Sequence, residues 1–163
     1  MLLSILMKSV QFDDPWKRKC AIENEEIYNI DNHMIFLNNL NQNIDFSYNR
    51  IVTKELKQKH ASYKSQDKKN NKFDQEQHIS YPELLNKLQM SQLKCFYCND
   101  NLLLLYRNKN EKKQWSLERL NNNLGHYNDN TCIACLQCNL QRRNENYEYF
   151  QKAKQWKIVK NDS

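Results

Sequence analysis

The stretch Cys95-Phe-Tyr-Cys98 and its counterpart Cys135-Leu-Gln-Cys138 decide the fold of this chain. Each pair presents two sulfurs from a single turn, and four thiolates in two such pairs suit the tetrahedral coordination of one zinc ion. The paired spacing favours metal binding in a reducing compartment over disulfides, which are the alternative for a chain with six cysteines. We therefore expect these four cysteines to bind a structural Zn2+ ion that closes the segment between the pairs.

The rest of the composition explains why a bound metal would matter. Of the 163 residues, 39% are hydrophobic and 27% are charged, and the mean hydropathy is −0.98. Such a chain forms one ordinary domain, or a small domain with an extension, whose core is small relative to its surface. A small core often needs a metal, and a zinc site contributes on the order of 10 kcal/mol to folding. The formal charge of +6 favours polyanionic partners.

Three regions follow from the distribution of polar and apolar residues. Residues 1–53 mix apolar and Asn-rich segments, so we expect a small α/β region there, with short strands and a helix. Residues 54–77 are strongly polar and basic, which indicates a linker or an exposed helix. Residues 78–157 contain the cysteine pairs and form the main module. The other two cysteines, Cys20 and Cys132, are expected to be small core residues.

No segment predicts export or membrane association. The apolar opening, residues 1–7, is short and lacks the basic region and the cleavage site of a signal peptide, so we expect it to pack as a first strand or helical turn. No stretch approaches the roughly 18 apolar residues of a membrane-spanning helix. We therefore expect a soluble intracellular protein of the cytoplasm or nucleus.

The main module is expected to be α+β. Ser80 and Glu83 form a capping-box pattern, and the leucines after them predict a short helix before the first cysteine pair. Residues 102–106 and 114–120 are typical of two strands, which a polar turn would join into a hairpin. After the second pair, apolar residues at helical spacing predict one helix that runs to about Trp156. The expected order is helix, cysteine knuckle, hairpin, loop, second knuckle and helix.

The strings between and after the cysteine pairs resemble a known family. In order, they are Ser116-Leu-Glu-Arg-Leu-Asn121, Gly125-His126, Asn128-Asp-Asn130 and Cys135-x-x-Cys138-Asn139. With this order and spacing, residues 80–155 resemble the HNH, or ββα-metal, endonuclease domains of the zinc-binding type, which include phage resolving endonucleases and phage and giant-virus homing endonucleases. The resemblance covers about half of the chain. It implies a metal-dependent nuclease that hydrolyses DNA, or alternatively RNA, and a virus-encoded protein would fit it.

The resemblance also implies a second metal site, made of oxygen ligands. Glu118 stands where the family has its metal-binding carboxylate, and Asn139 stands at the last position of the motif. Carboxylate and amide oxygens suit Mg2+ or Mn2+, and such an ion neutralises charge on a phosphate during hydrolysis. Asn130 matches the central Asn, whose implied role is to hold the loop by hydrogen bonds. The alternative for each is ordinary polar surface in an Asn-rich chain.

The chain departs from the family at the residue after the acidic position. Many HNH enzymes have a general-base histidine there, but this chain has Arg119, which cannot act as a base at neutral pH. His126 is the only histidine between the two cysteine pairs. It suits base chemistry, and the alternative is a loop histidine that bonds to the backbone. Arg119 is then expected to bind the scissile phosphate or to stabilise its developing charge.

Four basic residues are candidates for contacts with nucleic acid. Arg142 and Arg143 lie three and four residues after Asn139, so one continuous helix would place all three on the same face. The start of that helix also favours anions, which suits a phosphate backbone. Lys112 and Lys113 would add sequence-independent contacts. The alternative is a solvated basic surface.

We therefore expect a metal-dependent HNH endonuclease in which the N-terminal region chooses the site or the partner. A second interpretation, kept open by Arg119, is a catalytically silent zinc-binding module of the HNH fold that binds nucleic acid or protein within a larger assembly. A third is a zinc-ribbon interaction protein, which explains the cysteines but not the other strings.

Overall fold

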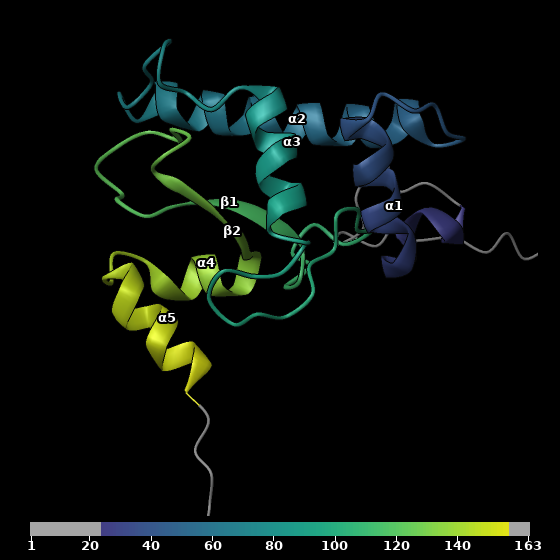
Figure 1. The fold of residues 1–163 in the computed structure, drawn as a ribbon. Helices are drawn as coiled ribbons and strands as arrows, with labels where there is room; N and C mark the ends of the chain where they lie inside the picture. Colours follow the sequence, from purple (N-terminus) through teal and green to yellow (C-terminus); the bar gives the residue numbers. More distant parts are fainter. Residues whose placement is uncertain (1–23, 157–163) are drawn as a thin grey trace, which may run out of the picture.

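The computed structural model describes residues 24–156 and folds them into five α-helices, one 3-10 helix and a two-stranded antiparallel sheet (Figure 1). In chain order the elements are η1 (Glu25–Tyr28), α1 (Ile30–Asn41), α2 (Asn49–Lys69), α3 (Tyr81–Met90), β1 (Trp115–Arg119), β2 (Thr131–Cys135), α4 (Leu136–Arg142) and α5 (Tyr147–Gln155). The α+β class is confirmed. The expectations for residues 1–7 and for Cys20 lie outside the described residues. Between residues 24 and 156, no helix is long and apolar enough to cross a membrane.

The described part of the N-terminal region is helical, so the strands expected there are wrong for residues 24–53. Helix α1 begins after Asn29, whose side chain accepts a hydrogen bond from the Asp31 N–H (3.1 Å). Its buried side chains lie on one helical face: His33, Phe36 and Leu37. Apolar residues with this spacing bury one face of a helix, whereas a strand would bury every second residue.

Most of the polar segment 54–77 belongs to helix α2. This helix has 21 residues, and its buried side chains form one stripe: Val52, Leu56, Tyr63 and Asp67. Of the two interpretations, a linker or an exposed helix, the helix is therefore present over residues 54–69, but it is not exposed all round, because one face of α2 is part of the core. The Leu117 N–H donates a hydrogen bond to the Tyr63 hydroxyl (2.9 Å), which joins α2 to strand β1.

Helix α3 begins as the sequence predicts. The Ser80 hydroxyl accepts a hydrogen bond from the Glu83 N–H (3.4 Å), and the Ser80 N–H donates to the Glu83 carboxylate (2.7 Å). Both halves of the capping box are thus present. The leucines that follow are buried, and they pack α3 against α1, α2 and β2: Leu84, Leu85 and Leu88.

The predicted strand 114–120 is present as β1, but its partner is not the predicted one. Strand β1 pairs with β2, and Glu118 lies opposite Cys132 in the antiparallel register. Residues 102–106 are irregular and share one isolated bridge with the segment before β1, between Leu103 and Gln114. All five residues of β2 are buried. A strand buried on both faces lacks the alternation of polar and apolar residues by which strands are recognised in a sequence.

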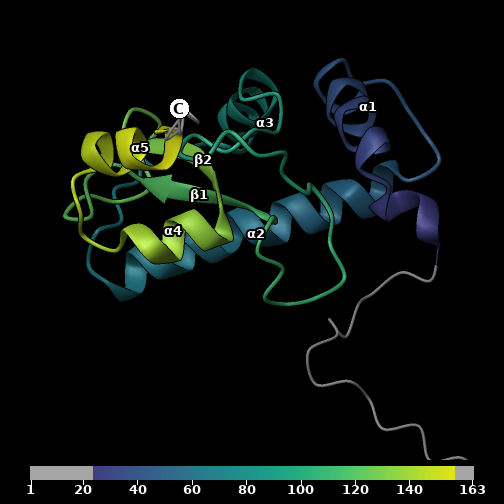
Figure 2. The ribbon, with the colours of Figure 1, turned by 90° about the horizontal axis from the view of Figure 1, so that it is seen from below.

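Helices cover the hairpin on both sides (Figure 2). Helices α3 and α5 lie on one side, and α2 and α4 lie on the other. One hydrophobic core extends through these layers, and its most buried members include Ile27, Leu37, Leu56, Leu88, Trp115 and Leu117. The groups on the two faces of the hairpin are therefore held by different pairs of helices.

The single helix expected after the second cysteine pair is in fact two helices. Helix α4 stops at Arg143, whose φ of 52° is a left-handed conformation that cannot continue a helix. Asn146 then caps α5, because its side chain accepts hydrogen bonds from the Glu148 and Tyr149 N–H groups (2.9 and 3.2 Å). The predicted apolar stripe is also wrong at Leu140, which is 64% exposed.

Candidate functional site

The four cysteines of the two pairs form one cluster. Their sulfur atoms lie within 4.8 Å of one another, which suits one ion bound by four thiolates. Cys95 and Cys98 lie in the turns after α3, while Cys135 ends β2 and caps α4, which contains Cys138. The Cys135 N–H donates to the Cys95 sulfur, and the Cys138 N–H donates to the Cys135 sulfur (both 3.2 Å). The cluster can hold a metal ion, and Cys132 lies outside it in the core.

A cavity of about 310 Å³ lies where α2, β1 and α4 meet, and we call it the cleft. Its lining includes five of the residues singled out from the sequence: Glu118, Arg119, His126, Asn139 and Arg143. Tyr63 and Gln66 of α2 also line the cleft. Helix α2 therefore contributes to the candidate site, although it lies outside the region that resembles the HNH family.

His126 reaches the cleft from the loop between the strands and is 4% exposed. Its Nδ1 atom lies 2.7 Å from one carboxylate oxygen of Asp67, and its backbone N–H donates to the other oxygen (2.7 Å). Burial lowers the pKa of His126 to about 4, although the Asp67 carboxylate acts in the opposite direction. The imidazole is therefore neutral at pH 7, which is the form that a general base requires.

Glu118 is paired with Arg142, and this pairing overturns the expected role of Arg142. Both side chains are buried, and Arg142 Nε lies 2.5 Å from Glu118 Oε1. The other guanidinium nitrogens donate to the Arg119 carbonyl, the Glu145 carbonyl and the Asn122 side chain. The predicted contact of Arg142 with nucleic acid is wrong, because the side chain is buried and makes its four hydrogen bonds inside the protein. Burial raises the pKa of Glu118, and the arginine opposes that rise.

Oxygen atoms suited to a divalent ion come from two adjacent elements. Asn139, in the first turn of α4, donates its amide N–H to the Ser116 hydroxyl (3.2 Å). Ser116 lies two residues before Glu118 on β1, so the two side chains are on the same face of the strand. The Asn139 amide oxygen and Glu118 Oε2 are therefore donors of the type that Mg2+ or Mn2+ prefers. Arg142 neutralises part of the Glu118 charge, which weakens this donor pair.

Side chains at both ends hold the loop between the strands. The Asn130 amide donates to the carbonyl oxygens of Asn121 and Gly125 (both 3.0 Å), and its oxygen accepts the Asn121 N–H (2.9 Å). These are the loop-holding hydrogen bonds expected of Asn130. Arg119 donates to the Leu124 carbonyl (3.1 Å) and also lines the cleft. Arg119, at the end of β1, is thus a cationic group of the cleft that a loop carbonyl helps to position.

Gly125 is the only glycine of the chain, and packing requires it. A Cβ atom at this position would lie 2.3 Å from the Lys72 carbonyl oxygen and 3.1 Å from Asp67 Oδ2. Both distances are shorter than ordinary van der Waals contact. The missing side chain therefore lets the loop that carries His126 approach the end of α2.

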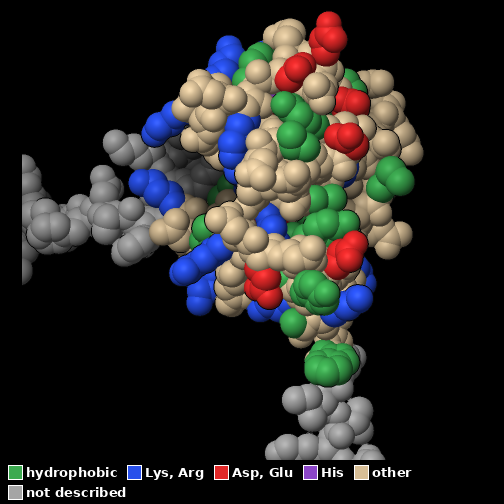
Figure 3. Space-filling view, turned by 90° about the vertical axis from the view of Figure 1, so that its left-hand side faces the viewer, with side chains coloured by type: hydrophobic (Ala, Val, Ile, Leu, Met, Phe, Trp, Pro, Cys, Tyr) green, Lys and Arg blue, Asp and Glu red, His purple; other side chains and the backbone are tan. Residues whose placement is uncertain are grey.

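The basic residues are unevenly distributed over the surface. Figure 3 shows Lys and Arg side chains around a hollow at the left of the drawn face, with Asp and Glu side chains over its upper right and lower middle. Arg143, Lys112 and Lys113 are exposed, as a contact with nucleic acid requires. Arg143 lines the cleft, and the Lys112 carbonyl accepts the N–H of Gln137 in the first turn of α4 (3.1 Å).

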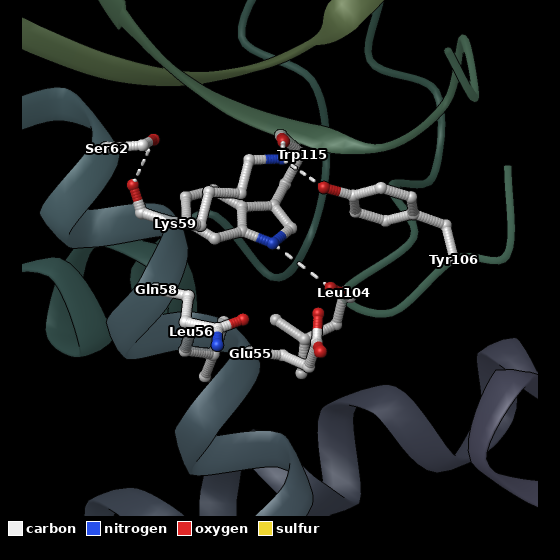
Figure 4. Close-up of a pocket in the computed structure, with 8 residues that line it drawn as sticks. All are labelled: Glu55, Leu56, Gln58, Lys59, Ser62, Leu104, Tyr106 and Trp115. Atoms are coloured by element: carbon white, nitrogen blue, oxygen red, sulfur yellow. Dashed lines mark hydrogen bonds between the residues drawn. The ribbon is translucent and has the colours of Figure 1, made fainter. Parts of the chain in front are cut away.

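A second cavity, of about 280 Å³, lies between α2 and the segment before β1 (Figure 4). Lys59 donates hydrogen bonds there to the Tyr106 hydroxyl, the Gln114 side chain and the Trp115 carbonyl. The ammonium also lies 4.4 Å from the centroid of the Trp115 ring. Because these contacts use its three donors, Lys59 joins α2 to β1 and is not a substrate-binding group.

Asp67 is the site residue that the sequence analysis missed, because it lies in the segment interpreted as a linker or exposed helix. The side chain is fully buried. One signal was present: Asp67 follows Tyr63 by four residues and so continues the buried stripe of α2. A carboxylate in such a stripe requires a buried partner. The partner, His126, lies 59 residues away, so no local pattern identifies it.

Comparisons with protein-family models, with curated proteins and with solved structures find no match for this chain.

Proposed function

We propose that the chain is an HNH-type endonuclease that hydrolyses phosphodiester bonds in DNA, with Zn2+ at the four cysteines and Mg2+ or Mn2+ at Glu118 and Asn139. One observation carries the proposal: a carboxylate, an amide, a neutral imidazole and two arginines line a single cavity. They come from β1, from the loop between β1 and β2, and from α4 and the residue that ends it. The three elements β1, β2 and α4 follow one another in the order strand, strand, helix. This set of groups is what hydrolysis of a phosphodiester needs.

Each residue of the cleft has one task in this proposal. His126 accepts a proton from the attacking water, because its imidazole is neutral. Arg119 and Arg143 bind the non-bridging oxygens of the phosphate, as guanidinium groups do. Glu118 and Asn139 hold the divalent ion, which, when bound, neutralises the charge that develops on the phosphate.

The cysteine cluster has a geometric role. Cys138 directly precedes Asn139, and Cys135 ends the strand that pairs with β1. A zinc ion bound by the four sulfurs would fix the start of α4 relative to the hairpin. The distance between Asn139 and Glu118 would then depend on the zinc site, although no cysteine lines the cleft.

Nicking of supercoiled plasmid DNA tests the proposal. The zinc-loaded protein should nick the plasmid with Mg2+ or Mn2+ and should stop when EDTA is added. Glu118→Gln and His126→Ala should each lower the rate by roughly 10²–10⁴-fold. Glu118→Gln is preferred to alanine because the amide oxygen still accepts the hydrogen bond from Arg142. Glu148→Gln, the same substitution at an exposed position of α5 outside the cleft, should cut like the wild type.

Three results would contradict the proposal. If the zinc-loaded wild type nicks DNA with neither ion, the chain is not an endonuclease of this kind. If Glu118→Gln cuts as fast as Glu148→Gln, the metal site is wrongly assigned. If Glu118→Gln loses activity but His126→Ala does not, His126 is not the general base. A labelled RNA of the same sequence, tested in parallel, decides between the two nucleic acids.

A second candidate function is a catalytically silent module that binds nucleic acid. The Glu118–Arg142 ion pair favours it, because a neutralised carboxylate attracts a cation less strongly. In that case duplex DNA should bind with a strong salt dependence, whereas divalent ions should produce no cleavage. Fluorescence anisotropy over a salt series, combined with the nicking assay, separates the two functions.

A further inference from the structure

A buried network of one acid and two histidines lies behind the cleft. Asp67 is fully buried, and its carboxylate contacts His126 twice, through the ring and through the backbone N–H. His78 Nδ1 lies 3.3 Å from Asp67 Oδ2, so a second imidazole shares the same carboxylate. The Ile79 N–H donates to the His126 carbonyl (2.9 Å), which fixes the backbone of His126 from the other side.

The geometry of this network determines which ring nitrogen of His126 carries the proton. An ionised carboxylate is an acceptor only. A hydrogen bond of 2.7 Å between Nδ1 and Asp67 Oδ1 therefore requires the proton on Nδ1. In the neutral ring the lone pair is then on Nε2. Nε2 is consequently the atom of His126 that can accept a proton in the cleft.

Burying an ionised carboxylate is energetically unfavourable, and a position that needs only a structural hydrogen bond does not require one. Transfer of an ionised acid into the interior costs several kcal/mol unless it is compensated. An asparagine amide could accept the backbone N–H of His126 at a lower cost of desolvation. The amide can, however, also donate to Nδ1, which would move the ring proton to Nε2. Only an acid excludes that alternative.

We propose that Asp67 is the positioning residue of the cleft, which holds His126 in the form protonated at Nδ1 and so directs the Nε2 lone pair to the substrate. The proposal rests on the proposed function of His126 as the base. Asp67 lies on α2, outside the region that resembles the HNH family. The catalytic unit therefore includes the long helix of the N-terminal half.

The tautomer of His126, measured by 15N NMR of labelled protein, tests the proposal together with steady-state cleavage. In the wild type the spectrum should show a proton on Nδ1 and none on Nε2. In Asp67→Asn the proton should move, in part or in full, to Nε2. The kcat should fall by roughly 10²–10⁴-fold with little change in KM, as is typical when a base is held in the wrong tautomer. Asp31→Asn, the same substitution at an exposed position of α1, should alter neither quantity.

The outcomes separate this inference from the proposed function. A wild type that does not cut DNA overturns both. A wild type that cuts DNA but carries the ring proton of His126 on Nε2 overturns this inference alone. An Asp67→Asn variant that loses activity while the tautomer of His126 is unchanged also overturns it, because that loss of activity would be structural. The wild-type spectrum needs no variant, so the test also holds if Asp67→Asn does not fold.

Discussion

Arg142 and Arg143 are neighbours in the sequence but have different surroundings. Arg142 is 3% exposed and paired with the buried Glu118, whereas Arg143 is exposed at the end of α4. Removal of one partner of a buried ion pair leaves an uncompensated charge, which costs about 3–5 kcal/mol. We therefore expect Arg142→Met to lower the free energy of unfolding by that amount in urea denaturation. Arg143→Met, the matched substitution, should change it by less than about 0.5 kcal/mol, and equal losses would contradict the assignment.

Arg143 should affect binding instead of stability. If it contacts a phosphate, Arg143→Met should weaken DNA binding equally for all sequences and should reduce the salt slope by about one. Fluorescence anisotropy at several salt concentrations measures both quantities. An unchanged slope would place the nucleic acid away from this end of the cleft.

His33 makes the stability of the protein depend on pH. Its Nδ1 accepts the Leu104 N–H (3.2 Å), its Nε2 lies 3.2 Å from the Ile27 carbonyl, and burial lowers its pKa from 6.5 to about 4. Between these two pKa values the unfolded chain binds more protons than the folded protein does. The folded state therefore loses stability as the pH falls from about 6.5 to about 4. The loss is about 2 kcal/mol between pH 8 and pH 5. Urea denaturation at pH 8 and at pH 5 measures this loss of unfolding free energy. The loss should be smaller for His33→Gln than for the wild type, by about 2 kcal/mol. Equal losses would show that His33 does not titrate in this way.

The loop after β1 depends on its single glycine. In Gly125→Ala the new methyl group would meet the Lys72 carbonyl and Asp67, so the loop must move away from α2. Overpacking of this kind costs typically about 1–3 kcal/mol. We expect thermal denaturation to show that loss and 15N NMR to show a weaker Asp67–His126 hydrogen bond. Asn123→Ala, at an exposed position of the same loop, is the control, and similar melting temperatures for the two variants would disprove the close approach.

Among the helices and strands, those with local signals could be predicted from the sequence. The capping box of Ser80 and Glu83 forms entirely within one turn, so its residues identify α3 without further information. The partner of β1 could not be found in this way, because the choice between residues 102–106 and β2 depends on helices that cover both faces of the sheet. The end of α4 was missed because Arg143 adopts a conformation that its residue type does not favour.

At the scale of the whole molecule, the cysteine cluster should control folding. A structural zinc ion contributes on the order of 10 kcal/mol to folding, which exceeds half of the stability of most small proteins. A strong chelator should therefore unfold the module, and Cys138→Ala should bind much less than one equivalent of zinc. Circular dichroism and metal analysis measure these effects. Cys132→Ala, in which the altered cysteine lies outside the cluster, should keep its zinc. A chelated protein that retains its spectrum would refute a structural zinc ion.

The cluster could be predicted over a separation of 40 residues, whereas the Asp67–His126 contact could not. Metal ligands are recognised by residue type and spacing, which do not depend on the rest of the fold. A hydrogen bond between a helix and a distant loop has no such pattern. It exists because Tyr63 and its neighbours on α2 pack against the hairpin.

Because α2 is one continuous helix, it limits where this chain can be joined to a segment of another protein. The same helix contributes Val52 and Leu56 to the core and Asp67 to the buried network behind the cleft. A recombination event, or a designed chimera, that joined a foreign N-terminal half at residue 78 would remove the partner of His126 while leaving all four cysteines of the cluster and every HNH-like string intact. A successful junction would have to lie before Asn49, where the helix begins.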